Sequence, residues 1–211
     1  MARGRFITFE GGEGGGKSTQ VRLLAERLAS LVSEVTTTRE PGGSPGAESI
    51  RALLVDGPPE RWSSLTETLL MYAARADHVE RVIRPALARG AWVVCDRFHD
   101  STRAYQGAGG GAPQDLIGQL ETSVLGSTRP DLTLILDLPV EAGLARAAAR
   151  GGGEARFEAK GLAFHQRLRE GFLAIAAAEP ERCVVLDASA APDHVADLVW
   201  ETVRARLDPP R

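Results

Sequence analysis

The sequence predicts an α/β fold in which a five-stranded parallel sheet carries helices on both faces. Five short runs of apolar and β-branched residues alternate with segments of helical periodicity, an order typical of parallel sheets. Runs of this composition suit strands covered on both faces, and right-handed crossovers would place the helices there. The predicted strands are residues 5–10, 34–38, 91–95, 131–137 and 182–186.

Between these strands the sequence predicts seven helices, of which the third could break near Asp77. They are residues 17–31, 48–54, 65–89, 113–126, 140–150, 158–178 and 192–207. Glycine-rich loops are expected at 11–16, 107–111 and 151–153, and a further loop at 41–45. The 151–153 segment, with charges on both sides, is either a lid of about residues 146–160 or a plain turn between two helices.

Composition indicates one ordinary globular domain over residues 1–211. The chain has a net charge of −3 and 43% hydrophobic residues. A chain of 211 residues can form a stable core without disulfides or structural metals. We expect no membrane span and no secretory signal. Cys95 and Cys183 lie in strand-like runs, where buried reduced thiols are expected. These features predict a cytoplasmic protein, and the scattered charge disfavours nucleic-acid binding.

The first glycine-rich loop fits the phosphate-binding pattern G-x-x-x-x-G-K-[ST]. It follows a predicted strand and precedes an amphipathic helix, the context that this motif requires. Glycines allow backbone N–H groups to surround an anion, and the helix N-terminus adds its positive end. The loop and the residue after it are Gly11, Gly12, Glu13, Gly14, Gly15, Gly16, Lys17, Ser18 and Thr19. Lys17 should reach the terminal phosphates of a nucleotide, and the Ser18 hydroxyl should bind Mg²⁺.

Two predicted strands end in an aspartate that could lie near this metal. Ligands bind at the carboxyl ends of parallel strands, so Asp96 and Asp137 both qualify. We favour Asp96 because Arg97 follows it and places a guanidinium at the same crevice. For Asp137 we favour the N-cap of the helix that starts at Val140.

The rest of the chain favours phosphoryl transfer to a small acceptor over other uses of such a loop. A GTPase needs an Asn/Thr-Lys-x-Asp segment, which neither lysine can supply, and a motor ATPase normally carries an Asp-Glu pair at a strand end. Transfer to an acceptor needs a second anion site and a lid that excludes water. Candidate arginines are Arg51, Arg75 and Arg97 for the acceptor, and Arg146, Arg150 and Arg156 around the predicted lid.

Six segments, in this order, resemble the bacterial thymidylate kinase family of the P-loop nucleoside monophosphate kinases. They are residues 9–13 (FEGGE), 38–43 (TREPGG), 72–75 (YAAR), 96–98 (DRF), 101–107 (STRAYQG) and 129–132 (RPDL). The resemblance runs over nearly the whole chain. It implies a P-loop kinase fold, and ATP and dTMP as small-molecule substrates, with no nucleic-acid or membrane partner.

For the phosphoryl donor, the resemblance implies that the phosphate loop through Thr19 binds ATP. Lys17 would bind the donor phosphates, and Ser18 and Asp96 would hold Mg²⁺. Arg146 resembles a residue that stacks near adenine. The catalytic arginine would come from the lid, because the phosphate loop has none, and we expect Arg150 and Arg156 to share this role.

For the acceptor, the resemblance implies that Arg97 and Arg51 bind the dTMP phosphate and that Glu13 lies near its sugar. Arg75 would donate to a thymine carbonyl. The remaining pocket residues would be Thr102 and Gln106 at the base edge, Tyr105 beside the sugar, and Met71 where the family more often has an aromatic ring. Whether Met71 or Tyr72 meets the base stays open.

Family members form homodimers, so a homodimer is expected, with the long helix 65–89 as a possible interface. Two other readings stay open. One is a kinase for another acceptor such as dUMP, dCMP or a deoxynucleoside. The other is a regulatory module that binds nucleotides without turnover.

Overall fold

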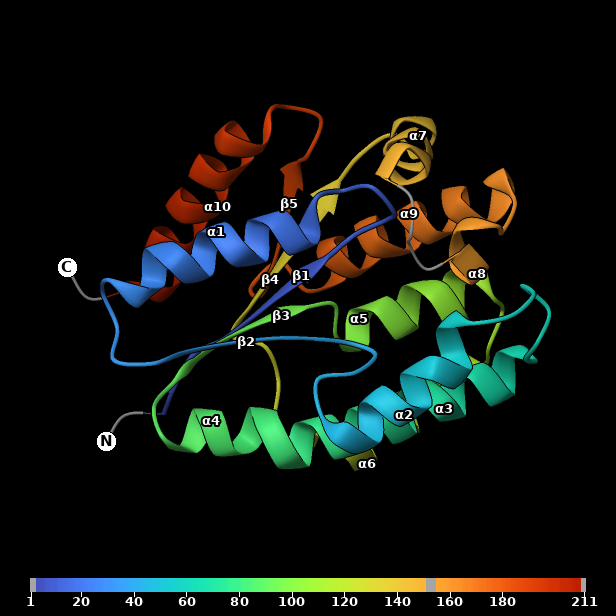
Figure 1. Cartoon of the computed structure of the whole chain (residues 1–211), viewed down its shortest axis with the longest axis horizontal. Helices are drawn as coiled ribbons and strands as arrows, with labels where there is room; N and C mark the ends of the chain where they lie inside the picture. Colours follow the sequence, from blue (N-terminus) through green and yellow to red (C-terminus); the bar gives the residue numbers. More distant parts are fainter. Residues whose placement is uncertain (1–2, 151–154, 210–211) are drawn as a thin grey trace.

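The computed structural model describes residues 3–150 and 155–209, and its centre is a sheet of five parallel strands. The strand order is β2-β3-β1-β4-β5, so β1 lies in the middle (Figure 1). The strands are β1 (Phe6–Glu10), β2 (Val35–Arg39), β3 (Trp92–Asp96), β4 (Leu132–Asp137) and β5 (Cys183–Asp187). All five residues of β1 are buried, which explains the apolar runs and confirms the predicted fold class.

Helices cover both faces of this sheet (Figure 1). α1 (Lys17–Ala29) and α10 (Pro192–Leu207) lie on one face. The opposite side carries α2 (Pro45–Val55), α3 (Ser64–His78), the π-helical segment η1 (Val79–Ile83), α4 (Arg84–Ala88), α5 (His99–Thr102), the π-helical segment η2 (Arg103–Gly109), α6 (Gln114–Leu125) and α9 (Leu162–Ala178). α7 (Val140–Arg150) and α8 (Ala155–Glu158) lie near the carboxyl ends of the strands.

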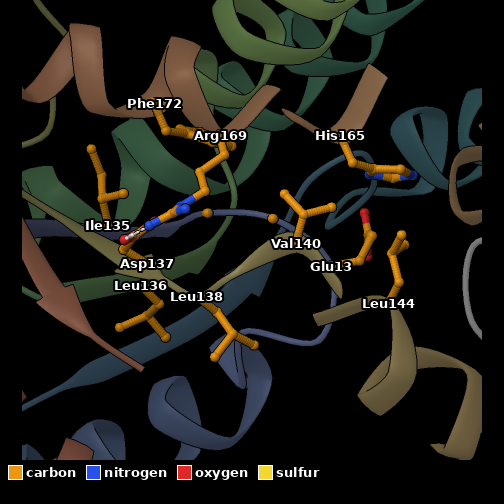
Figure 2. A pocket seen from close by; sticks show the side chains of 12 residues that line it. Glu13, Ile135, Leu136, Asp137, Leu138, Val140, Leu144, His165, Arg169 and Phe172 are labelled. Atoms are coloured by element: carbon orange, nitrogen blue, oxygen red, sulfur yellow. Dashed lines mark hydrogen bonds and ion pairs between the residues drawn. The ribbon is translucent and has the colours of Figure 1, made fainter. Parts of the chain in front are cut away.

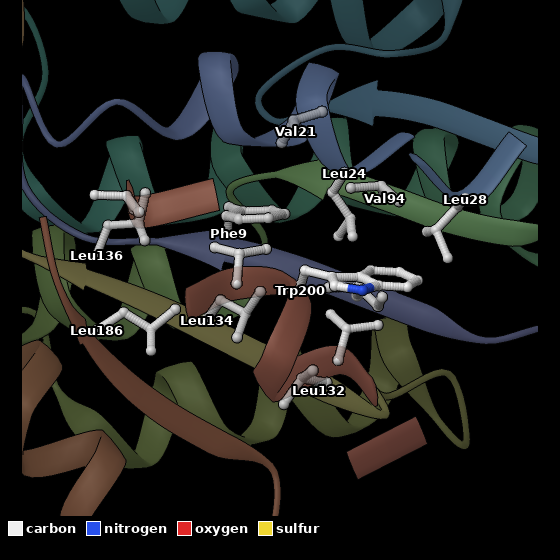
Figure 3. Packing of buried hydrophobic residues seen from close by; sticks show 14 of the residues in the cluster. Phe9, Val21, Leu24, Leu28, Val94, Leu132, Leu134, Leu136, Leu186 and Trp200 are labelled. Atoms are coloured by element: carbon white, nitrogen blue, oxygen red, sulfur yellow. The ribbon is translucent and has the colours of Figure 1, made fainter. Parts of the chain in front are cut away.

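The largest hydrophobic cluster lies between the sheet and the α1–α10 pair (Figure 3). Phe9 of β1, Leu134 of β4 and Leu24 of α1 are buried there beside Trp200 of α10. Fully burying such side chains stabilises the fold by about 1.5–3 kcal/mol each. This core fixes the end of β1, from which the phosphate loop leaves.

Several predicted boundaries were wrong. The segment predicted as helix 48–54 starts at Pro45, since proline suits the first turn of a helix. Helix 65–89 is continuous through the π-helical η1, which begins two residues beyond the predicted break. The predicted loop 107–111 begins inside η2, and predicted helix 158–178 is divided between α8 and α9. The glycines at 151–153 of the predicted lid lie outside the described residues.

Two further predictions concern the chain as a whole. Across the described residues, no helix is long and apolar enough to cross a membrane. Cys95 and Cys183 are buried in β3 and β5 as free thiols, and burial raises the pKa of the Cys183 thiol to about 12. At neutral pH this thiol is therefore protonated and unreactive.

Candidate active site

The phosphate loop lies between the end of β1 and the first residue of α1. Gly11, Gly14 and Gly16 have φ values of 125°, 68° and 82°. A Cβ atom on Gly14 would lie 2.1 Å from the carbonyl oxygen of Gly143 in α7. Glycine is therefore required at this point because the loop approaches α7 too closely for a side chain.

Lys17 is folded back onto its own loop. Its ammonium Nζ donates to the carbonyl oxygens of Gly12 (2.8 Å) and Gly11 (3.2 Å). Burial lowers the pKa of Lys17 to about 8, and the positive charge of Arg97 acts in the same direction. The ammonium is thus held inside the loop with a reduced preference for its charged form, which negative charge placed in the loop would restore.

Ser18 and Asp96 are in contact at the carboxyl end of the parallel strands. The Ser18 Oγ donates to Asp96 Oδ2 at 2.5 Å. Parallel pairing of β1 with β3 places Asp96 opposite Phe9, so its carboxylate reaches the start of α1. Hydroxyl and carboxylate oxygens of this kind are ligands that Mg²⁺ prefers, together with waters and phosphate oxygens. The two residues that the sequence assigned to the metal are therefore in contact.

Arg97, Glu13 and Tyr105 form a second polar group beside the loop. Arg97 has a φ of 68°, and its Nη atoms donate to Gly11 O (2.9 Å) and to Glu13 Oε1 (3.0 Å). The Tyr105 hydroxyl donates to the same Glu13 oxygen at 2.5 Å. Burial alone would raise the pKa of Glu13, but the charges of Arg97 and Lys17 lower it to about 2. Glu13 is therefore a carboxylate at neutral pH that orients both an arginine and a tyrosine.

A pocket opens next to Arg97, on the side of the sheet that carries α3. Arg75 is 2% exposed, and its guanidinium donates to Glu40 Oε2 (2.7 Å), Thr102 Oγ1 (3.0 Å) and the carbonyl of Phe98 (3.1 Å). Its Nη1 is buried and has no hydrogen-bond partner among the described residues. The lining consists of Glu40, Pro41, Met71, Arg75, Arg97, Phe98, Ser101, Thr102, Tyr105, Gln106 and Phe157. We call this the acceptor pocket.

Met71 lines the acceptor pocket, whereas Tyr72 points away into the core. Tyr72 packs with Ala112 and Ile117, and the Arg75 guanidinium lies 4.7 Å from the centre of its ring. Burial raises the pKa of the Tyr72 hydroxyl to about 12. The apolar side chain of Met71 therefore faces the pocket, and Tyr72 supports Arg75 from behind.

The other predicted arginines lie in different places. Arg51 Nη1 donates to the carbonyl of Pro41, which lines the acceptor pocket. Arg146 on α7 donates to the carbonyls of Ala188 (2.9 Å) and Ser189 (2.9 Å), after β5. Arg150, with 57% of its side chain exposed, pairs with Glu158 at 3.4 Å. The three are thus spread around the crevice rather than gathered at the phosphate loop.

A shared catalytic role would require Arg156 to extend toward the phosphate loop, but the structure places its guanidinium elsewhere. It is 1% exposed and donates to the carbonyls of Leu54, Pro58 and Pro59, while its Nη2 pairs with Glu67 at 2.5 Å. In this structure its guanidinium is directed to the end of α2, the α2–α3 connection and α3. The sequence missed this because glycine-rich segments leave the register of the lid undefined.

A second small pocket lies on the other side of the phosphate loop (Figure 2). Gly11–Glu13, the β4–α7 turn and α9 form its walls. Arg169 holds both Asp137 oxygens at 2.7 Å, so Asp137 serves as an ion-pair partner for α9 and not as the N-cap that we favoured. His165 also lines the pocket, and its Nε2 is buried without a partner among the described residues.

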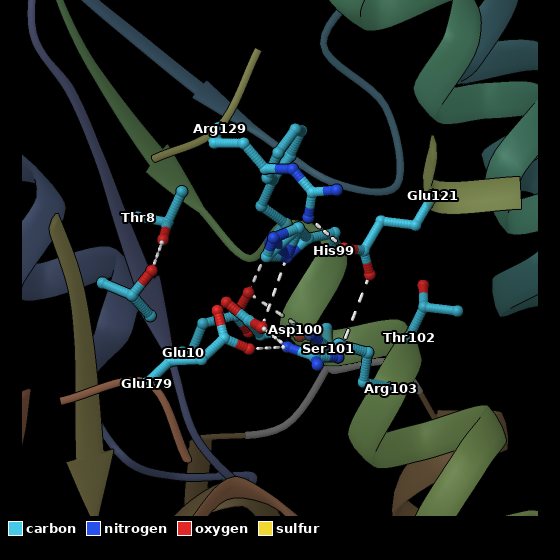
Figure 4. Close-up of polar contacts among 12 residues, drawn as sticks. Thr8, Glu10, His99, Asp100, Ser101, Thr102, Arg103, Glu121, Arg129 and Glu179 are labelled. Atoms are coloured by element: carbon cyan, nitrogen blue, oxygen red, sulfur yellow. Dashed lines mark hydrogen bonds and ion pairs between the residues drawn. The ribbon is translucent and has the colours of Figure 1, made fainter. Parts of the chain in front are cut away.

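A network of charged residues, which the sequence did not indicate, lies beneath the site (Figure 4). Glu10 accepts from the backbone N–H of Phe98 (2.8 Å) and from the Ser101 hydroxyl (2.5 Å), and Arg182 holds Asp100 at 2.6 and 2.8 Å. Burial raises the pKa of Glu10 to about 8, and the charge of Asp100 adds to this rise. The network fixes the β3–α5 turn, from which Arg97 projects.

Comparison with known proteins identifies the family of this chain and agrees with its fold. The family model described as thymidylate kinase matches residues 9–199. The thymidylate kinase of Caulobacter vibrioides is 67% identical over 207 residues, covering 98% of this chain and 99% of that protein. That of Rhodopseudomonas palustris strain CGA009 is 59% identical over 208 residues, covering 97% and 90%.

A solved structure shows the same arrangement of the chain. The crystal structure of thymidylate kinase from Ehrlichia chaffeensis superposes with a TM-score of 0.78 at 36% identity, and the match covers 95% of this chain and 99% of that one. The residues matched by the family model include the phosphate loop, the acceptor pocket and the described part of the predicted lid. The chain belongs to the thymidylate kinase family.

Proposed function

We propose that this chain transfers the γ-phosphoryl group of ATP to dTMP, giving dTDP and ADP. The observation that carries the proposal is the acceptor pocket, which shares Arg97 with the phosphate-loop site. Arg75, whose buried Nη1 has no hydrogen-bond partner in the described part of the chain, lines this pocket. Membership of the thymidylate kinase family supports both substrates.

In the acceptor pocket, Arg75 Nη1 would donate to a thymine carbonyl oxygen. Thr102 accepts from Arg75 and so positions it, while Gln106 offers its amide to the base edge. Met71 would contact the base face through its thioether. Tyr105, held by Glu13, would pack beside the sugar where a ribose 2′-hydroxyl would project, which favours deoxyribose.

For the transfer step, Arg97 and Arg51 would hold the acceptor phosphate in line with the donor. Lys17 would leave the loop carbonyls and bind the donor phosphates, and Gly11 through Thr19 would supply backbone N–H groups. The attacking phosphate oxygen is already anionic at neutral pH. No general base is therefore required, and positioning with charge stabilisation carries the reaction.

Mg²⁺ is the metal that this site fits. Ser18 and Asp96 offer a hydroxyl and a carboxylate in direct contact, and Mg²⁺ typically takes one or two such protein ligands besides phosphates. When bound, it would neutralise and orient the phosphates of ATP. Ser18 and Asp96 would hold it at the start of α1.

We also propose a single domain over residues 1–211 with a lid at about 146–160. Arg150 is the better candidate for the lid arginine that neutralises the transferred group, because its guanidinium is exposed and its partner Glu158 belongs to the same lid. Arg146 would lie near adenine. The reaction is assigned to the cytoplasm, where the buried Cys95 and Cys183 thiols would stay reduced.

A homodimer is proposed from the surface of α2 and α3. These helices pack side by side, and Leu53, Leu65 and Leu69 on them are 40%, 50% and 46% exposed. A symmetric dimer would cover such a face with its own copy. Sedimentation of Leu69→Glu beside the unchanged protein tests this, and an unchanged mass for both at the monomer value would contradict it.

The decisive assay is ADP release from ATP–Mg²⁺ with dTMP, dUMP, dCMP, dGMP, UMP or no acceptor. We expect preference for dTMP and little release without an acceptor. Preference for another monophosphate would show that the acceptor pocket has been assigned to the wrong base. ATP binding without acceptor-dependent release would instead favour a regulatory module.

A further inference from the structure

We infer that Glu67 of α3 sets the base selectivity of the acceptor pocket by fixing the orientation of the Gln106 amide, and that Arg156 of α8 holds Glu67 in place. The inference rests on the proposed phosphorylation of dTMP and adds positioning residues to it. Neither Glu67 nor Arg156 is required to touch the substrate.

The Glu67–Gln106 contact determines which end of the amide faces the base. Gln106 Nε2 donates to Glu67 Oε1 at 2.8 Å, and the two residues are 1% and 3% exposed. A carboxylate only accepts hydrogen bonds, so the NH₂ end of the amide must face Glu67. The carbonyl oxygen of Gln106 is then directed away from Glu67, toward the acceptor pocket that Gln106 lines.

Two cations keep the Glu67 carboxylate in this position. Arg156 Nη2 pairs with Oε2 at 2.5 Å, and Lys160 Nζ lies 3.8 Å from Oε1. The Arg156 guanidinium also donates to three carbonyl oxygens, those of Leu54 in α2 and of Pro58 and Pro59 after it. Phe157, the next residue, lines the acceptor pocket and packs edge-on against Tyr105, with ring centres 5.7 Å apart. The α8 segment thus fixes the pocket through Glu67.

The resulting pattern of donors and acceptors fits thymine. Arg75 Nη1 is a donor and the Gln106 carbonyl is an acceptor, whereas thymine presents an O4 acceptor beside an N3–H donor. Cytosine presents an N4 amino donor and an N3 acceptor, so it would be mispaired with both groups. Uracil shares the thymine edge, and Glu67 therefore selects against cytosine and not against uracil.

Replacing Glu67 with glutamine removes the constraint, because a glutamine amide both donates and accepts. The Gln106 amide can then rotate and present its NH₂ end to the base. We expect the ratio of kcat/KM for dTMP to that for dCMP to fall about tenfold to a hundredfold in Glu67→Gln, the range for one mispaired buried hydrogen bond. A purely structural defect would lower both values alike and leave the ratio unchanged.

Two further variants make the test independent of folding. Glu67→Gln leaves the buried Arg156 charge without its carboxylate, so Glu67→Gln with Arg156→Met removes both charges and should show the same fall in the ratio. Glu121→Gln is the matched control. It makes the same exchange at a buried carboxylate that pairs with Arg129 and lines neither pocket described above, and it should keep the ratio of the unchanged protein.

The outcomes separate this inference from the proposed function. An unchanged protein that selects dTMP, together with folded Glu67 variants that keep its selectivity, overturns the role of Glu67 alone. An unchanged protein without dTMP-dependent ADP release overturns the proposed function. Loss of selectivity in both Glu67 variants, with Glu121→Gln unaffected, supports the inference.

Discussion

The acceptor pocket and the phosphate loop differ in how far their side chains are already in place. In the acceptor pocket, Arg75, Thr102 and Gln106 are at most 2% exposed and hydrogen-bonded to other protein groups. At the phosphate loop, Lys17 is turned onto the loop's own carbonyls, and Arg150, which lies away from this loop, has 57% of its side chain exposed. The proposed base site is preassembled, whereas the proposed phosphate site depends on groups that would have to move. Preassembly lowers the entropic cost of binding a base. Movement allows the cationic side chains to surround the phosphates only once these are bound.

The largest effect that this comparison predicts is for Lys17→Met. We expect kcat to fall at least about a thousandfold, since a cation that stabilises transferred charge is lost. The free energy of unfolding should not fall, because burial already lowers the pKa of Lys17 and so disfavours its charge. Steady-state ADP release and chemical denaturation measure the two quantities. Substantial destabilisation would show that Lys17 is as much a structural group as Arg75.

Arg75→Met should combine loss of activity with loss of stability. We expect kcat/KM for dTMP to fall about a hundredfold, and unfolding to cost about 3 kcal/mol less, because the buried Glu40 carboxylate loses its arginine partner and keeps its contact with His78 at 2.9 Å. Adding Glu40→Gln should recover much of the stability and little of the activity. Calorimetry and the same kinetic assay check this. Loss of activity without any loss of stability would contradict a preassembled pocket.

Arg150→Ala and Arg156→Ala should separate the two halves of the predicted lid. We expect Arg150→Ala to lower kcat about tenfold to a thousandfold with an unchanged Tm, as for removal of one charge-stabilising group. Arg156→Ala should lower Tm because it leaves the buried Glu67 carboxylate with Lys160 at 3.8 Å in place of a 2.5 Å ion pair. Thermal melting and kcat for each variant decide, and the reverse pattern would make Arg156 the catalytic arginine.

The smallest predicted effect is the pH dependence of ATP binding. Lys17 has a pKa of about 8 when no phosphate is present, so below pH 8 it is charged and ATP affinity should be nearly constant. Above pH 8 the ammonium loses its proton, and the affinity should fall by up to about tenfold per pH unit. Calorimetric titration from pH 6.5 to 9.5 measures this. Adenosine, which lacks phosphates, should show no such slope.

Local patterns predicted the parts of the molecule that are local. The phosphate loop and β1 follow from consecutive residues, and α7 and α10 have their predicted bounds. Arg156 could not be placed in this way, because its partner Glu67 lies on a distant helix and the sequence between α7 and α8 is rich in glycine. Asp137 was misassigned for a similar reason, since Arg169 of α9 reaches it only in the folded chain. The family resemblance supplied six of the residues that line the acceptor pocket, and the fold adds the others: Glu40, Pro41, Phe98, Ser101 and Phe157.

The π-helical segment η2 has a consequence for how the acceptor pocket tolerates change in length. It carries Tyr105 and Gln106, and it lies against α9, where a Cβ atom on Gly171 would lie 2.7 Å from Ala108. A π-turn contains one residue more than an α-turn, so deleting a single residue would convert η2 to an α-helix. The following residues would then rotate by about 100°. Insertions and deletions here would therefore redirect the pocket as a unit, which makes the length of this segment, as well as its residues, part of the proposed base recognition.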